Sequence, residues 1–521
     1  MPVIQKLRFA AYLILLCFFT ACRPDPSTTA AAGRCYYISN AGSDANEGTQ
    51  AAPFKTLGKL THTHLQPGDT VYLQGGQTFD GTLFIDSAAG THENPVVITS
   101  SGNGRAVING GDSNAIALYK CNFIKLVNIH CQGAGRKTGN VKDGIALNTC
   151  SNIWLNDIDV SGFQKSGVLV YDCDIVYIDH LQAHDNGFAG IAVSGDYGKH
   201  NCSNIHITHS DAFNNPGDPT NLTNHSGNGI IAGYCKKVTI EYCTATNNGW
   251  DMPRTGNGPV GIWCFEADSV TIQHCISYAN KTSKGGGDGG GYDLDGGVTN
   301  SVIQYCLSYN NQGSGFGIFQ YAGAGNWHDN IIRYNISEND GAVSPAQAGV
   351  FIWNSSRDTN QFKNCLFYNN VIYNVKVAAI SYDKESEHAG FSFYNNIFVG
   401  ADNLITGKMD GDTFTGNDWW SLHGGFDIGS NTSFIAWARQ NMQEQYNGKL
   451  VGCNAKPLFS NPGNTSTVLP GNLAAFNNYQ LPAGDSLRSK GVNLQAIFGI
   501  NNGGKTFNGN NAPAIGMGAS F

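Results

Sequence analysis

The sequence predicts an all-β solenoid of the parallel β-helix class, and a recurring four-residue phrase is the first observation behind this prediction. Glycine, an apolar residue, any residue and a second apolar residue return at spacings from 23 residues (Gly144 to Gly167) to 39 residues (Gly190 to Gly229). The copies begin at Gly144, Gly167, Gly190, Gly229, Gly261, Gly291, Gly315 and Gly349. A period of this length indicates stacked repeats, and the alternation inside each copy predicts a short strand with one buried face. Because one such repeat cannot bury a core alone, the copies must stack on one another.

Two further segments in each period are the second observation. A second apolar strand follows most copies, as in 152–155, 204–207, 237–240, 269–272 and 301–304. A third short segment ends in paired asparagines, as in 212–215, 245–248, 309–311 and 368–370. Side-chain amides can hydrogen-bond along a stack. We therefore expect a parallel β-helix whose corner asparagines are structural rather than catalytic.

The two ends of the predicted solenoid differ from its middle, as capping segments should. Residues 54–65 are expected to form a short helix that closes the N-terminal mouth of the domain, which spans 35–521. Residues 408–450 are expected to be an insertion with one amphipathic helix, because apolar residues recur at helical spacing between 432 and 446. The glycine-rich segment 451–521 is expected to be an irregular cover on the last coils.

The first residues have the pattern of an export signal. Lys6 and Arg8 precede an apolar run that is too short to span a membrane, and small residues lead to Cys22. This segment resembles a bacterial lipoprotein signal peptide over 1–22, followed by a flexible tether over 23–34. Lipidation of Cys22 would make the chain an exported lipoprotein on the periplasmic or cell-surface face of an outer membrane, held by the lipid anchor only. The alternative is ordinary cleavage near Ala21, or after residues 30–32.

Composition and cysteine spacing give no indication of a nucleic-acid partner or of a zinc site. Charged residues make up 13% of the chain and the net charge is −8, with no motif for nucleic-acid binding, so nucleic acid is not expected as a partner. The cysteines recur at equivalent places in the repeats and have no zinc-ligand spacing. We expect them to stack as free, small apolar side chains inside the coils.

Short motifs near both ends carry a family resemblance. They are Tyr36–Ser39, Gly42–Asp44, Pro53–Leu57, Pro67–Thr70 and Asn510–Gly516. The chain resembles the superfamily of secreted right-handed parallel β-helix proteins, which includes pectate lyases and glycoside hydrolases. The resemblance implies a right-handed β-helix over nearly the whole mature chain. It leaves the reaction open, because this fold carries lyases, hydrolases, epimerases and adhesins.

Alignment of the glycine phrases predicts one outward strip in which acids and aromatic rings gather. With the glycine as position zero, positions two and four point outward, and adjacent coils lie ~4.8 Å apart. Asp293 and Asp295 occupy these positions on one coil. The aromatic residues at these positions on nearby coils are Trp263, Phe265, Phe319, Phe351 and Trp353. Aromatic faces suit the apolar faces of sugar rings, so these five are candidate substrate-binding residues.

Asp293 and Asp295 are the candidate catalytic pair. Glycosidic hydrolysis needs one carboxyl group as acid and another as nucleophile or base. At i and i+2 their Cα atoms are ~6.6 Å apart on one face, and mutual repulsion should raise one pKa. Glu266 or Asp288 could substitute in one of the roles, and Trp250 and Arg254 could form a wall of the cleft. No cofactor is required by this scheme.

Other chemistries are compatible with the same acids. Asp293 and Asp295 could bind calcium instead, or be plain surface residues. The stretch 288–321 resembles calcium-dependent pectate lyases with a lysine base, but the lysine position falls on Asp295. The positions of their metal-binding aspartates fall on Gly313, Ser314 and Gly317. Lysines nearby in sequence could serve another elimination scheme: Lys281 and Lys284.

The sequence therefore favours a monomeric, exported enzyme that hydrolyses a polysaccharide or oligosaccharide. A uronate lyase and a non-catalytic glycan-binding surface protein are the alternatives.

Overall fold

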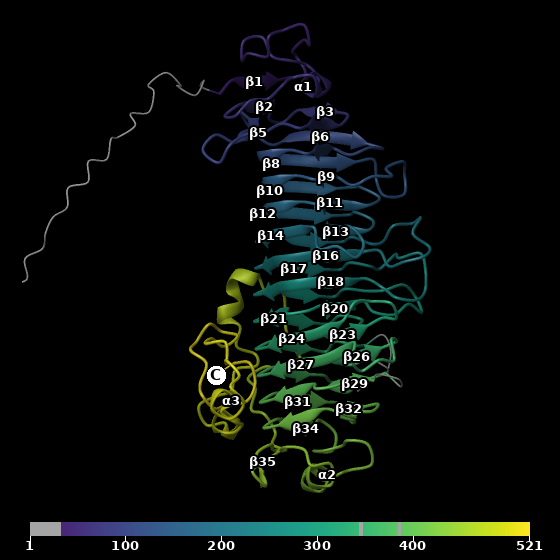
Figure 1. The fold of residues 1–521 in the computed structure, drawn as a ribbon, viewed down its shortest axis with the longest axis vertical. Coiled ribbons are helices and arrows are strands. Elements are labelled where there is room, and N and C mark those ends of the chain that lie inside the picture. Colours follow the sequence, from purple (N-terminus) through teal and green to yellow (C-terminus); the bar gives the residue numbers. More distant parts are fainter. Residues whose placement is uncertain (1–32, 343–346, 384–386, 521) are drawn as a thin grey trace, which may run out of the picture.

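The structure is a computed structural model that describes residues 33–342, 347–383 and 387–520. Strands β1 to β34 form one continuous sheet system in which the paired strands run parallel, coil upon coil, along the long axis of the molecule (Figure 1). The pairings sort these strands into three stacked sheets, which we call sheets 1, 2 and 3. The predicted right-handed parallel β-helix is confirmed as the fold.

The glycine phrases form sheet 1. Its strands are β4 (Leu83–Asp86), β7 (Ile116–Tyr119), β9 (Ile145–Asn148), β11 (Ser166–Tyr171), β13 (Ala189–Ser194), the first halves of β16 (Asn228–Glu241) and β18 (Val260–Gln273), β20 (Gly290–Leu294), β23 (Phe316–Gln320), β26 (Val350–Asn354), β29 (Ile380–Tyr382) and β32 (Ile405–Thr406).

The second segment of each period forms sheet 2. Its strands are β1 (Cys35–Ile38), β2 (Thr70–Gln74), β5 (Val96–Ser101), the first halves of β8 (Asn122–Gly133), β10 (Ser151–Ser161) and β12 (Asp174–His184), β14 (Cys202–Thr208), the second halves of β16 and β18, β21 (Val302–Gln304), β24 (Trp327–Arg333), β27 (Phe362–Tyr368), β30 (Ser392–Tyr394) and β33 (Thr413–Thr415).

The third segment forms sheet 3. Its strands are β3 (Thr78–Asp80), β6 (Ala106–Gly111), the second halves of β8, β10 and β12, β15 (Asp211–Phe213), β17 (Thr244–Thr246), β19 (Ile276–Tyr278), β22 (Leu307–Tyr309), β25 (Ile336–Glu338), β28 (Val371–Tyr373), β31 (Ile397–Gly400) and β34 (Asp418–Ser421).

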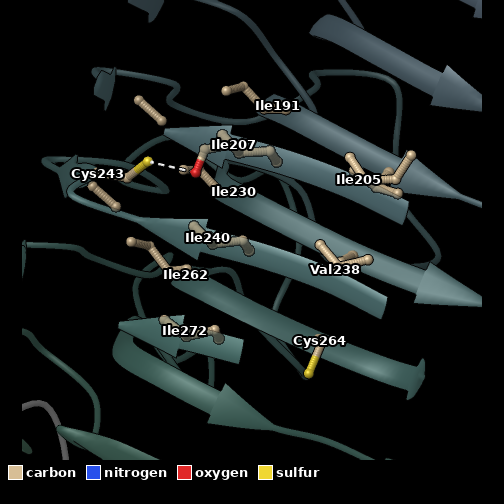
Figure 2. Close-up of a cluster of buried hydrophobic side chains, with 14 of the residues drawn as sticks. Ile191, Ile205, Ile207, Ile230, Val238, Ile240, Cys243, Ile262, Cys264 and Ile272 are labelled. Atoms are coloured by element: carbon tan, nitrogen blue, oxygen red, sulfur yellow. Dashed lines mark hydrogen bonds between the residues drawn. The ribbon is translucent and has the colours of Figure 1, made fainter. Parts of the chain in front are cut away.

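The interior of the coils is filled by apolar side chains that repeat from one coil to the next. Figure 2 shows this stacking in the middle of the solenoid, where Ile191, Ile230 and Ile262 come from sheet 1 and Ile207 and Ile240 from sheet 2. All of these side chains are fully buried. Alternation along each strand therefore puts one side-chain set inside and leaves the other for the outer surface.

The corner asparagines form buried ladders, as expected. In each rung, the side-chain oxygen of one residue accepts the backbone N–H of its counterpart in the preceding coil, as from Asn215 to Asn248 (3.1 Å). One ladder consists of Asn186, Asn215, Asn248, Asn280 and Asn311 and ends at Asp340, and the other of Asn335, Asn370, Asn396 and Asn417 and ends at Glu444. The asparagines satisfy backbone donors at bends where no strand partner is present.

The cysteines also lie where the repeat predicts. Every cysteine in the described part of the chain is free, and all of them except Cys35 are buried. Several thiols donate to a carbonyl of the neighbouring coil, as Cys243 does to Ile207 (3.5 Å, Figure 2).

A short helix lies at each end of the stack (Figure 1). Helix α1 (Gly58–Thr61) is the short N-terminal helix expected within 54–65, and α2 (Phe434–Gln440) is the helix expected within 432–446. The expected insertion 408–450 begins too early, however, because β33 and β34 continue sheets 2 and 3 up to Ser421. A two-stranded antiparallel pair, β35 (Gln445–Tyr446) and β36 (Lys449–Leu450), follows α2.

The C-terminal segment lies against the later coils, as the yellow ribbon beside them in Figure 1 shows. It contains η1 (Pro470–Ala475), η2 (Ser486–Ser489) and α3 (Leu494–Phe498). Outward residues of sheet 3 pack against it, for example Leu307 and Ile336 against Leu473 and Tyr479. The expected irregular cover is thus present.

The predicted signal peptide (1–22), lipidated Cys22 and most of the tether (23–34) lie outside the described residues. Among the helices that the structure describes, none has the length and hydropathy needed to cross a membrane.

Candidate functional site

A cleft of about 650 Å³ lies on the outer face of sheet 1, in the middle of the solenoid. We call it the central cleft. Its acidic lining residues are Asp288, Asp293, Asp295 and Asp383, and its aromatic ones are Tyr234, Trp263, Phe265, Phe319, Tyr321, Phe351 and Trp353. The structure therefore brings both candidate catalytic aspartates and all five candidate aromatic residues into one place.

Strand alternation positions these side chains. In β20, Tyr292 and Leu294 are fully buried inside the coil, whereas Asp293 between them faces the cleft. Asp293 pairs with Trp263 on the preceding coil and with Gly317 on the next, and Gly317 pairs with Phe351. The register that the glycine phrases predict is therefore the register that builds the site.

Asp293 is the most deeply buried acid of the cleft. It is 2% exposed, and its Oδ1 atom has no hydrogen-bond partner among the described residues. Burial, with the nearby charges of Asp295 and Asp288, raises the pKa of Asp293 well above its usual range. Both effects favour the protonated form of this carboxyl group.

Gly317 makes room for this carboxyl group. A Cβ atom at Gly317 would lie 2.9 Å from Oδ1 of Asp293 and 2.8 Å from Cζ of Phe319. Any side chain there must displace the acid, the ring or both.

We therefore expect Gly317→Ala to leave the fold intact and to lower turnover about a hundredfold, because a shift of about 1 Å in a reacting group has that effect. Turnover and the melting temperature, measured together, check this result. Gly424→Ala is the matched control, because a Cβ there would meet no atom within 4 Å. Unchanged turnover in Gly317→Ala would show that the position of Asp293 does not matter.

Two of the other three acids, Asp295 and Asp288, are partly satisfied by backbone donors. Asp295 Oδ1 accepts the N–H of Gly296 (2.7 Å), and Asp288 Oδ2 accepts the N–H of Gly258 (2.7 Å). Burial raises the pKa of Asp295 to about 7. The hydrogen bond from Gly296 opposes this rise, whereas the charges of Asp288 and Glu266 add to it. Burial raises the pKa of Asp288 to about 6, while the Gly258 N–H and the Arg254 charge oppose the rise. Asp295 is therefore easier to ionise than Asp293.

The aromatic residues form two walls beside the acids. Trp263 and Phe265 are neighbours on β18, with ring centroids 5.5 Å apart. Phe319 meets Phe351 at 5.4 Å and Trp353 at 6.2 Å, edge to face. The acids thus lie in an apolar surrounding that lowers the local dielectric and supplies ring surfaces.

Three predicted site residues lie elsewhere. Glu266 accepts the hydroxyl of Tyr321 (3.2 Å) and the N–H of Gly325 (3.0 Å), so it anchors a loop instead of lining the cleft. The guanidinium of Arg254 donates to Asn257 near the rim of the cleft. Trp250 packs against the guanidinium of Arg136 (5.9 Å) and is not a lining residue.

The pattern did not single out several lining residues, notably His225, Tyr234, Tyr321 and Asp383. The longest glycine spacings offered a signal for the first of them. The 39-residue step from Gly190 to Gly229 contains more residues than one coil needs, and His225 lies in that excess. Extra loop residues next to an aromatic strip are candidates for further lining residues of the cleft.

Among the described residues, the side chains that are grouped closely enough to hold a metal ion do not lie in the cleft. The one group of three ligand atoms within 4.8 Å of one another, in the part of the chain described here, is Asp179 and His180 on one coil with His209 on the next, away from the central cleft. The cleft aspartates are not grouped in this way. Together with glycine and serine at the positions of the pectate-lyase metal aspartates, this arrangement does not fit the calcium site that the resemblance implies.

Comparisons with known proteins agree with the fold. The family description "Pel9A-like, right handed beta helix region" matches residues 36–342. Pectate lyase L of Paenibacillus polymyxa is 24% identical over 314 residues, which are 56% of this chain and 60% of that protein. The uncharacterized protein YwoF of Bacillus subtilis is 29% identical over 166 residues, which are 32% of this chain and 31% of that protein. The chain thus spans three fifths of the length of pectate lyase L and about a third of the length of YwoF.

Several solved structures match this chain at low identity. A mutant of the PL6 family alginate lyase AlyGC matches with a TM-score of 0.52 and 17% identity, over 72% of this chain and 52% of that one. The GH136 lacto-N-biosidase of Eubacterium ramulus has a TM-score of 0.48 and 18% identity, over 73% and 66%. Pectate lyase Pel9A has a TM-score of 0.44 and 14% identity, over 94% and 97%.

The family match covers more than half of the chain, so this protein belongs to the family of Pel9A-like right-handed β-helix proteins.

Proposed function

We propose that the chain hydrolyses glycosidic bonds in a polysaccharide or oligosaccharide bound in the central cleft. One observation carries the proposal: two carboxyl groups at i and i+2 on one strand face an aromatic-walled cleft, with unequal hydrogen bonding and raised pKa values. Two carboxyl groups whose surroundings separate their protonation states are the working pair of a glycosidase.

The environments of the two carboxyl groups support a separate role for each. Asp293, without a hydrogen-bond donor at Oδ1, keeps its proton and gives it to the glycosidic oxygen as the bond to the anomeric carbon breaks. Asp295, stabilised by the Gly296 N–H, is the carboxylate. It either attacks the anomeric carbon, with water releasing the sugar in a second step, or takes a proton from the water that attacks. In both cases one water molecule is consumed and the leaving sugar gains a hydroxyl group.

Charge in the cleft favours hydrolysis over elimination. Among the described lining residues there is no lysine or arginine, and the ionisable ones are aspartates, tyrosines and one histidine. A uronate would bring its own carboxylate beside these acids, whereas an uncharged sugar would not.

A uronate lyase is the second candidate, favoured by the sequence similarity to pectate lyase L. Incubation with a panel of plant and algal glycans, followed by mass analysis of the products, separates the two. Products that have gained one water per cleaved bond support hydrolysis. Products without that water, with ultraviolet absorption from a new double bond, would support the lyase. Bound but uncleaved glycan would identify a non-catalytic binding protein.

The pH profile of the hydrolase follows from the two pKa values. The active state has Asp295 ionised and Asp293 protonated, so kcat/KM should rise as the pH increases through about 7 and fall once Asp293 loses its proton. The optimum is therefore expected on the alkaline side of neutrality. Measurement of kcat/KM from pH 4 to 10 checks this. An optimum near pH 4–5, where an unperturbed aspartate titrates, would contradict the role of burial.

We also propose that the mature chain is an exported, lipid-anchored monomer that needs no cofactor. The export signal and Cys22 support the anchor. Mass analysis of the mature N-terminus tests it, because a diacylglycerol on Cys22 adds a defined mass, and an unmodified N-terminus after Ala21 or Ala32 would refute it. Unchanged turnover after treatment with a calcium chelator is the expected result for the cofactor, and its loss would favour the lyase.

A further inference from the structure

His225 lies in the wall of the central cleft, beside the candidate acids. It comes from the loop between β15 and β16 and is 7% exposed. Its ring meets the indole of Trp263 edge to face, with centroids 4.9 Å apart, and touches Phe188 on the other side (5.8 Å). Packing from two sides fixes the plane of the ring.

Asn228 determines which ring nitrogen carries the proton. The Oδ1 atom of Asn228 accepts the N–H of Val260 (3.3 Å) and the indole N–H of Trp263 (3.1 Å), so the orientation of the amide group is fixed. Its Nδ2 atom donates to the carbonyl of Phe188 (3.1 Å) and lies 3.1 Å from Nδ1 of His225. Because an amide nitrogen can only donate, Nδ1 must accept, and the proton of the neutral ring is on Nε2.

The ring is also held neutral. Burial lowers the pKa of His225 to about 4, and the positive charge of Arg254 acts in the same direction. His225 is thus an uncharged donor with one N–H, on Nε2, and the described residues offer that N–H no partner. Nε2 is not among the fully buried, unpartnered atoms of the described residues, so this donor is open to the central cleft, where a ligand atom can accept its hydrogen bond.

We infer that the Nε2–H group of His225 donates a hydrogen bond to an uncharged oxygen of the sugar bound in the central cleft, a hydroxyl or a ring oxygen. His225 is then a specificity-determining residue, and Asn228 is the positioning residue that presents its N–H. The sugar as ligand rests on the proposed function. A neutral donor of this kind brings no positive charge to the cleft, so it does not offset the repulsion between a carboxylate ligand and the aspartates that line the same cleft.

The first test needs no substrate. Nitrogen chemical shifts of His225, measured by NMR between pH 5 and 8, are expected to show the neutral Nε2–H form throughout. In Asn228→Leu, which removes the donor to Nδ1, a mixture of both neutral forms should appear. A wild-type ring protonated on Nδ1, or charged at pH 6, would overturn the inference whether or not the protein hydrolyses glycans.

The second test uses Asp293→Asn protein, in which bound sugars are not cleaved, and soluble cello-, malto-, xylo- and galacto-oligosaccharides beside oligogalacturonate as probes. At least one uncharged series should bind and shift the Nε2–H resonance of His225. In that background, His225→Leu should weaken this binding about tenfold, the loss of one hydrogen bond. His225→Gln, which keeps an N–H at similar reach, should retain most of it.

His423→Leu, a substitution of an exposed histidine paired with Asp402, is the control and should bind as before. Equal weakening in His225→Gln and His225→Leu, a response to oligogalacturonate alone, or no response to any probe would overturn the inference. Because binding is measured without turnover, a protein that binds through His225 but cleaves nothing would refute the proposed hydrolysis and leave the role of His225 standing.

Discussion

Asp293→Asn is expected to lower the turnover number by two to four powers of ten, which is the usual contribution of a general acid, with the fold unchanged. The physical reason is specific to this carboxyl group. It is buried and its Oδ1 atom lacks a hydrogen-bond partner. In the proposed mechanism, its proton is the one that passes to the glycosidic oxygen. Asparagine keeps the shape and removes that proton. Turnover on the glycan that the panel identifies, together with circular dichroism, measures the effect.

Asp86 offers a matched control. It ends strand β4 on sheet 1, in the same outward row as Asp295 but many coils away, and it is exposed. Asp86→Asn should therefore turn over substrate as the wild type does. If Asp293→Asn and Asp295→Asn both retained full activity, the carboxyl pair would not be the catalytic pair.

The raised pKa of Asp295 also makes the stability of the fold depend on pH in a definite direction. The pKa of Asp295 in the folded chain, about 7, lies above the ~3.9 of an unfolded aspartate. Its favourable contribution is therefore complete below about pH 4 and is lost as the pH rises through about 7. Asp295→Asn has no such loss. The melting temperature of the variant, relative to that of the wild type, should therefore rise between pH 4 and pH 8.

The second large effect is expected in the asparagine ladder. Oδ1 of Asn280 accepts both the backbone N–H of Asn248 (3.2 Å) and its side-chain Nδ2 (2.9 Å), and Nδ2 of Asn280 donates to the carbonyl of Ala245 (3.2 Å). Asn280→Ala leaves these buried groups without their partner. At about 1–3 kcal/mol for each unsatisfied group, the free energy of unfolding should fall by about 3 kcal/mol or more.

Denaturant unfolding checks this result against Asn103→Ala, which changes an exposed asparagine in the turn after β5. The control should stay within about 0.5 kcal/mol of the wild type, as exposed sites usually do. A similarly small change in Asn280→Ala would mean that water replaces the amide group and that the ladder adds little to stability.

The repeat made the fold and much of the cleft predictable. Glycine, then alternating apolar residues, decides which side of each strand is inside, and this alone puts Asp293 and Asp295 outside on one coil. The loops were different. Glu266 follows the strand pattern, but its backbone is in the left-handed region (φ 44°), which turns the side chain toward the 321–325 loop. His225 has no repeat position at all, and its place in the wall depends on contacts with Trp263 and Asn228 that lie outside any periodic pattern.

The start of the predicted insertion, at residue 408, is too early for a related reason. Its glycine phrase is missing, so the coil at 413–421 has no visible sequence period, yet Phe414 and Trp419 still fill the interior and the backbone still pairs. Burial and strand pairing can continue a coil after the sequence signature has faded.

The buried, unpaired thiols have a consequence for how opening of this solenoid can be followed. Cysteines such as Cys202, Cys235 and Cys243 are enclosed, and burial raises their thiol pKa values, that of Cys202 to about 11, so alkylating reagents meet no reactive sulfur at these positions in the closed chain and find only Cys35 exposed among the described cysteines. Since they are spread over many coils, the labelling rate of each cysteine would report how often its own coil separates from its neighbours. The chain carries a natural series of reporters along its axis, and mass spectrometry could map from it where the solenoid frays first.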